Sequence, residues 1–158
     1  MKSKKTRLVA MLVLCSAIFN ARAPAQEVAQ APSTEDQAGV IGCLRTINTA
    51  ELTYANTYKN GFSSNLKALA APNEGTSYIA SAAGLIDASL LGGKRNGYVF
   101  TYKAAAPDDQ GKISGYTVSA RPIKWQKGTQ RFFTDQTDVV RSTAENRPAT
   151  AKDRDIDK

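Results

Sequence analysis

An amphipathic pattern between Asp36 and Tyr58 constrains the fold of this chain more than any other feature of its sequence. When residues are placed at steps of about 100°, eight side chains fall in one stripe about 120° wide, and seven are apolar or aromatic. The stripe consists of Val40, Cys43, Leu44, Ile47, Glu51, Tyr54, Ala55 and Tyr58. Gly61 follows where a left-handed helix end favours glycine. The pattern predicts a long helix with one buried face.

Glu51 is the one charged residue in this stripe. An unpaired buried carboxylate is very costly, so Glu51 must have a partner or reach water. In the structural interpretation, it accepts hydrogen bonds from an arginine of the sheet or from loop amides. In the catalytic interpretation, it is a general acid with a raised pKa. We favour the structural role, because one carboxylate without a second catalytic group makes no mechanism.

From residue 97 onward the hydrophobic period changes to two, which is typical of strands. Two segments present alternating buried positions: Tyr98, Phe100 and Tyr102, then Tyr116, Val118 and Ala120. QRFFTDQ predicts a third strand, and DVVR at 138–141 continues it or makes a fourth. A helix followed by consecutive strands predicts an α+β domain, with the helix packed on an antiparallel meander of three or four strands.

The first 25 residues are typical of a secretory signal peptide. A basic start precedes an apolar run over 8–19, and APA precedes Gln26. Twelve helical residues rise about 18 Å, which is short of a hydrocarbon core about 30 Å thick. We expect cleavage after Ala25, export to the periplasm or the exterior, and no stable transmembrane anchor afterwards. A lipoprotein would instead use Cys15, but Leu14 is too large for the position before a lipidated cysteine.

Three segments follow this leader. Residues 26–37 are polar and contain proline, so we expect a disordered linker. Residues 38–141 hold nearly all the aromatic and β-branched residues and form the predicted domain. Residues 142–158 have Ile156 as their single large aliphatic, which predicts a disordered polar tail.

The sequence gives little support for catalysis. It contains no histidine, which excludes Ser-His-Asp triads, Cys-His pairs and zinc sites with imidazole ligands within this chain. Cys43, the only cysteine after the leader, has an apolar context with Arg45 as its nearby cation, which favours a buried structural thiol over a reactive or bridging one. We predict a protein that is not an enzyme, with no catalytic residues.

Most of the net charge of +7 lies in the leader, because the remaining chain has 16 bases and 14 acids. A local excess remains, since residues 38–141 carry twelve bases and seven acids. A basic strip lies within it: Arg121, Lys124, Trp125, Lys127 and Arg131. Such a strip with an exposed indole fits DNA, polyanionic glycans or a membrane surface. Its structural alternative is a hairpin loop with solvated lysines and a tryptophan folded onto the sheet.

The order and spacing of segments over residues 38–141 resemble the globular head of type IV pilins and type II secretion pseudopilins. The resemblance rests on LRTINTAELTYANTY, a GF turn, NLKALAAP, LID, GYVFTY, GYTVSARP and QRFFTDQTDVVR. Its most specific part is the last run, with Phe132, Phe133, Asp135, Val140 and Arg141 in the places such heads fill.

The resemblance implies a pilin-like head with protein partners in a pilus or secretion assembly. The chain departs from the family at its start, because the apolar run is short and lies inside a removable signal. The long hydrophobic helix that anchors pilins and forms the filament core is missing from this pattern. We therefore expect an exported accessory component that does not pack into a filament by the usual helix bundle.

Some members of that family bind calcium near their last strands. By resemblance, Asp135 and Asp138 are the weak candidates for calcium ligands, with Asp108 and Asp109 as another pair. These carboxylates lack the twelve-residue pattern of an EF-hand. The alternative is that they cap backbone amides in turns. We expect no other cofactor.

Overall fold

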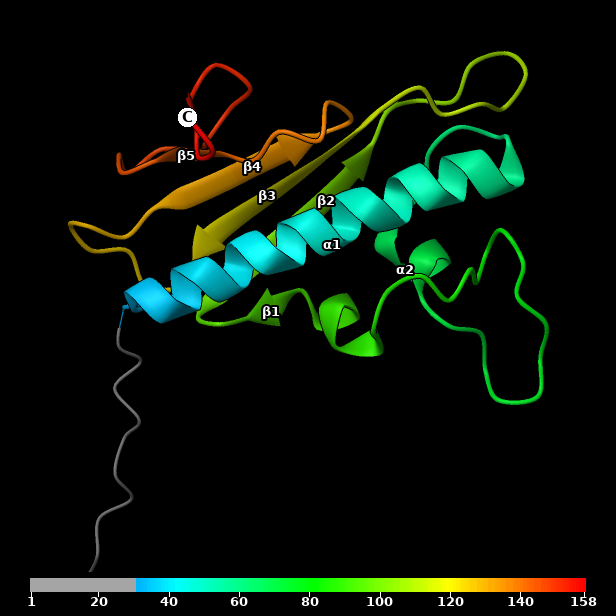
Figure 1. The fold of residues 1–158 in the computed structure, drawn as a ribbon, viewed down its shortest axis with the longest axis horizontal. Coiled ribbons are helices and arrows are strands. Elements are labelled where there is room, and N and C mark those ends of the chain that lie inside the picture. Colours follow the sequence, from blue (N-terminus) through cyan, green and yellow to red (C-terminus); the bar gives the residue numbers. More distant parts are fainter. Residues whose placement is uncertain (1–30) are drawn as a thin grey trace, which may run out of the picture.

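The computed structural model describes residues 31–158, so the predicted signal peptide and most of the predicted linker lie outside the described residues. The elements follow one another along the chain (Figure 1) as α1 Thr34–Tyr58, α2 Leu66–Leu69, the 3₁₀ helix η1 Ala88–Gly92, β1 Lys94–Arg95, β2 Tyr98–Ala104, β3 Tyr116–Pro122, β4 Arg131–Asp135, β5 Arg141–Thr143 and β6 Arg154–Asp155. Among these residues, no helix combines the length and the apolar character needed to cross a bilayer.

Helix α1 begins at a capping box, earlier than predicted. The Ser33 hydroxyl accepts from the Asp36 amide, and the Asp36 carboxylate accepts from the Ser33 amide at 2.8 Å. Such reciprocal bonds satisfy two amides that a helix end leaves free. The predicted linker over 26–37 is therefore wrong from Thr34 onward. The helix ends at Tyr58, and its C-cap Lys59 takes the left-handed conformation that the sequence pattern predicted at Gly61.

The sheet has six antiparallel strands in the order β1-β2-β3-β4-β5-β6. The predicted fold, a helix on a meander of three or four strands, is therefore wrong. The sequence did not reveal β1 and β6, and the possible fourth strand over 138–141 overlaps β5 only at Arg141; these three strands have two or three residues each. A strand this short is too brief to show an alternating hydrophobic period.

The carboxyl-terminal segment belongs to this sheet. Strand β6 pairs with β5, and the Ile156 amide donates to the Val140 carbonyl at 3.1 Å. Ile156 packs against the core, and Ala149 is buried. The predicted disordered tail over 142–158 and the domain boundary at 141 are therefore wrong. The charged composition of this segment predicted disorder, but two of its charges stabilise an ordered loop: Arg147 and Asp153 form an ion pair between β5 and β6.

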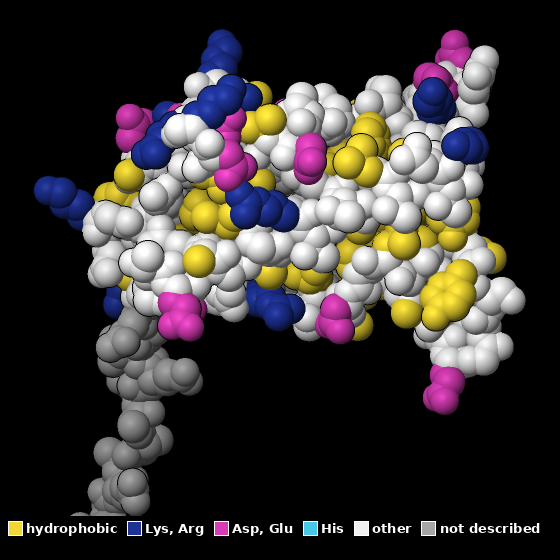
Figure 2. Space-filling view, in the orientation of Figure 1, with side chains coloured by type: hydrophobic (Ala, Val, Ile, Leu, Met, Phe, Trp, Pro, Cys, Tyr) yellow, Lys and Arg dark blue, Asp and Glu magenta, His cyan; other side chains and the backbone are white. Residues whose placement is uncertain are grey.

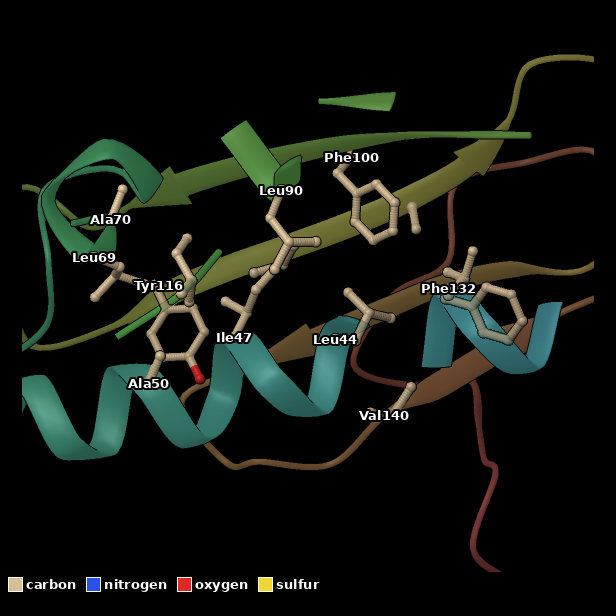
Figure 3. Packing of buried hydrophobic residues seen from close by; sticks show 14 of the residues in the cluster. Leu44, Ile47, Ala50, Leu69, Ala70, Leu90, Phe100, Tyr116, Phe132 and Val140 are labelled. Carbon is tan, nitrogen blue, oxygen red and sulfur yellow. The ribbon is translucent and has the colours of Figure 1, made fainter. Parts of the chain in front are cut away.

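The hydrophobic core lies between α1 and the face of the sheet that carries Phe100, Tyr116 and Phe132. Figure 3 shows Leu44 and Ile47 extending from α1 into this space. Both side chains are fully buried. The other face of the sheet carries the alternate residues of β2, β3 and β4, which are half-buried or exposed.

Leu44→Ala should lower the free energy of unfolding by about 2–5 kcal/mol, because it leaves a cavity in a closed core. The matched control is Leu52→Ala on the same helix, where the leucine is 43% exposed and little change is expected. Urea denaturation followed by circular dichroism measures both. Equal effects of the two substitutions would contradict this description of the buried face.

Candidate binding surfaces

Glu51 is fully buried and hydrogen-bonded to three donors. Its carboxylate accepts from the Ser63 amide at 2.8 Å, from the Ser63 hydroxyl at 2.6 Å and from the Tyr102 hydroxyl at 2.7 Å. The partners are one loop amide and two hydroxyls, with no arginine among them. Burial, more than any other cause, raises the pKa of the Tyr102 phenol far above its usual value, so it stays a proton donor. This arrangement ties the segment after α1 to both the helix and the sheet.

Asn48 is a second buried polar residue of α1, and sequence reasoning missed it. Its amide donates to the Thr134 hydroxyl at 2.8 Å, and its oxygen accepts from the Tyr116 hydroxyl at 3.0 Å. It therefore joins α1 to β3 and β4. The signal was available, because Asn48 lies four residues after Leu44 and so shares its helix face.

Tyr102→Phe should lower the free energy of unfolding by about 1.5–3 kcal/mol, because it removes a donor to a buried carboxylate. Tyr58→Phe is the control, since its half-buried ring has no hydroxyl hydrogen bond within the described structure and little change is expected. Chemical denaturation of both variants at neutral pH measures the difference. If Tyr102→Phe were as stable as the parent, Glu51 would not depend on this donor.

The Cys43 thiol is half-buried and free. Burial raises its pKa above the usual value, and the nearby positive charge of Arg95 opposes this only in part. A raised pKa keeps the thiol protonated at neutral pH, which disfavours nucleophilic attack. The geometry is that of a packed side chain on the edge of the core.

The calcium candidates are engaged in turns. One Asp135 oxygen accepts from the Thr137 amide at 2.9 Å and from its hydroxyl at 2.5 Å. Asp108 likewise accepts from the amides of Gln110 and Lys112. Within residues 31–158, no three acidic, cysteine or histidine side chains gather as metal ligands. Calcium binding at Asp135 and Asp138 stays a prediction, and the geometry fits turn capping.

The structure brings part of the predicted basic strip together. Arg121 directly follows Ala120, and Arg131 directly precedes Phe132; Ala120 and Phe132 pair across the two strands, and their side chains are buried on the inner face of the sheet. Because side chains alternate along a strand, both arginines belong to the outer face. Lys124 and Lys127 are exposed in the loop between β3 and β4.

Trp125 does not provide the exposed indole that the binding interpretation requires. Its side chain is half-buried, and its ring N–H is enclosed without an acceptor among the residues described. The outer face instead offers Phe133, which is half-buried and paired with Ser119 on one side and Arg141 on the other. Sequence reasoning missed Arg141 as a surface residue, because its place depends on the register of the short strand β5.

We call six residues the outer basic face: Lys103, Arg121, Lys124, Lys127, Arg131 and Arg141. None of them lies within 4.0 Å of a carboxylate in the part of the chain that the structure describes. On the helix side, by contrast, Arg45 is paired with Asp157 at 2.5 Å. The same face also carries Asp135 on β4 and Asp155 on β6, the cross-strand partner of Arg141, so its charge is a net positive one of six bases and these two acids.

Two neighbouring apolar residues form a second candidate surface, the apolar tip of Tyr78 and Ile79. They are 68% and 54% exposed. The tip is a tight hairpin, with two hydrogen bonds between Ile79 and Ala82. The Tyr54 hydroxyl donates to the Ala80 carbonyl at 2.9 Å and so fastens the hairpin to α1.

A third feature is a hollow of about 370 Å³ between the start of α1 and the carboxyl-terminal strands. Its lining is part apolar and part polar: Ala38, Ile41, Phe132 and Ile156 are apolar, and Thr34, Gln37, Gln130, Ser142 and Arg154 are polar. Figure 2 shows hydrophobic side chains at the bottom of this depression. Its volume lies within the range of ordinary ligand pockets, about 300–1,000 Å³.

Comparison of the chain with protein-family models, with curated proteins and with solved structures finds no match.

Proposed function

We propose that this protein is an exported, non-catalytic component of an envelope assembly of the type IV pilus or type II secretion kind. The observation that carries the proposal is the apolar tip. Two adjacent large hydrophobic residues that remain exposed on an anchored hairpin are typical of a protein contact. The sequence resemblance over residues 38–141 supports the class of assembly.

The tip is held ready for a partner. The Tyr78 ring lies over Gly84, where an added Cβ would stand 2.3 Å from the ring, so the glycine leaves room for it. Gly84 also has φ +69°, which disfavours other residues. A side chain that is already ordered loses less entropy on binding. The apolar tip therefore suits tight contact with a protein better than a loose hydrophobic surface would.

Capture from the protein's own envelope fraction tests this proposal. Mature wild-type protein should recover pilus or secretion-channel subunits, and Tyr78→Ser with Ile79→Ser should recover about tenfold less, as expected when contact residues worth about 1.4 kcal/mol are lost. The control pair is Leu52→Ser with Leu91→Ser, which removes exposed leucines elsewhere. Recovery of no such subunits, or equal recovery by the tip variant, would contradict the proposal.

A second function, binding of single-stranded DNA, is favoured by the outer basic face. Its arginines occupy adjacent strands and flank Phe133. Positive charge that follows a nucleic-acid backbone, together with an aromatic ring for base stacking, is the usual arrangement for such binding. None of these arginines forms a salt bridge within residues 31–158, although Arg131 donates to the Asn146 side chain and Arg141 to the Asp153 carbonyl.

Arg121→Glu with Lys124→Glu should weaken binding to an oligothymidylate probe and lower the dependence of log Kd on log salt by about 0.7 for each lost phosphate contact. Lys59→Glu with Lys67→Glu is the charge-matched control on the helix side. Fluorescence anisotropy at several salt concentrations measures both. An affinity that does not change with salt concentration, or an equal loss of affinity in the two variants, would contradict DNA binding. Selective binding of heparin would indicate a glycan as the ligand instead of DNA.

A further inference from the structure

We propose that copies of this chain associate head to tail, with the apolar tip of one copy seated in the hollow of the next. The inference deepens the proposed function, because it takes the same tip as the contact and names a second copy of the chain as the partner. Four observations carry it: the chemistry of the hollow, its volume, the charges around the two surfaces and their positions in the molecule.

The hollow has the right chemistry and room for the tip. The half-buried Ile41 on α1 and Ile156 next to β6 supply the apolar walls, and Phe132 on β4, which is 2% exposed, lies beneath them. A volume of about 370 Å³ accommodates side chains as large as an aromatic ring with an aliphatic neighbour. Burial of apolar surface on both sides would drive the contact.

The two surfaces carry opposite charges. Glu74 is the only charged residue in the loop 71–84 that bears the tip. Arg154 is the only charged residue among those that line the hollow. Both are exposed, and neither is ion-paired within the described residues. Charges of opposite sign across a contact favour the correct partner and orientation.

The two surfaces lie at opposite ends of the molecule. Along the horizontal long axis of Figure 1, the first turns of α1 and strand β5 lie at one end, and the loop between α2 and η1 extends from the other. Figure 2 shows that both face the viewer on the helix side. A copy therefore cannot fill its own hollow. A contact between two different surfaces repeats into a ring or an open chain, unless two copies exchange tips and close into a two-fold dimer.

A mixing experiment with the mature protein tests the inference. Wild type should increase in mass with concentration in sedimentation velocity. A tip variant, Tyr78→Ser with Ile79→Ser, and a hollow variant, Ala38→Glu, should each remain monomeric. Ala38 is exposed, and its substitution by glutamate near a helix start should not unfold the chain. An equimolar mixture should form dimers and nothing larger, because each dimer then has one intact tip in one intact hollow.

A charge exchange provides a second readout. Glu74→Arg alone and Arg154→Glu alone should each raise the concentration needed for association by about three- to tenfold, in proportion to a loss near 1 kcal/mol. The chain that carries both substitutions should associate like wild type, since every contact again joins opposite charges. Leu52→Ser with Leu91→Ser should have no effect.

A wild type that stays monomeric at millimolar concentration, or a variant mixture without dimers, would overturn the inference. The outcome is separable from the proposed function. If the tip variant loses envelope subunits while wild type stays monomeric, the proposed function stands and self-association falls. If wild type self-associates but recovers no pilus or secretion subunits, self-association stands and the proposed function falls.

Discussion

The buried carboxylate of Glu51 is the constraint on which the arrangement of this molecule depends. A charge in a closed core must be surrounded by donors, and here they come from Ser63 and Tyr102. Satisfying Glu51 therefore fixes the chain that follows α1 against both the helix and β2. That segment leads into α2, and the C-cap of α2, Ala70, is hydrogen-bonded to the loop that bears the tip. The Gly84 amide donates to the Ala70 carbonyl at 2.9 Å. The position of the apolar tip thus follows from the carboxylate in the core.

The parts of the fold that the sequence predicted are those with a long, regular pattern. The long helix and strands β2, β3 and β4 each bury alternate or helically spaced residues over five residues or more, so their period is visible. Strands β1, β5 and β6 are too short for that, and they form because a neighbouring strand offers free backbone groups. The polar segment after Ser142 is ordered by pairing and by the ion pairs of Arg147, which composition does not reveal.

How far the sequence predicted each candidate surface depended on how close together its residues lie along the chain. Arg121 and Arg131 lie near each other in sequence across one hairpin, so a local count of charges found them. Arg141 joins them only through the pairing of β4 with β5. The hollow brings Ile41 and Ile156 together from opposite ends of the described chain, and no local pattern carries that information. The sequence left both an exposed and a folded-back Trp125 open, because burial of a loop side chain depends on what packs over it.

The candidate surfaces lie on opposite sides of the sheet, and this separation has a consequence. The apolar tip and the hollow lie on the helix side, whereas Arg121, Arg131 and Arg141 belong to the outer face. Head-to-tail contacts would therefore leave the outer basic face of every copy free. A chain of copies repeats that face at a fixed spacing, so weak contacts with one long polyanion add up through effective concentration. Self-association and polyanion binding would then reinforce each other, because each raises the local concentration of the surface that the other uses.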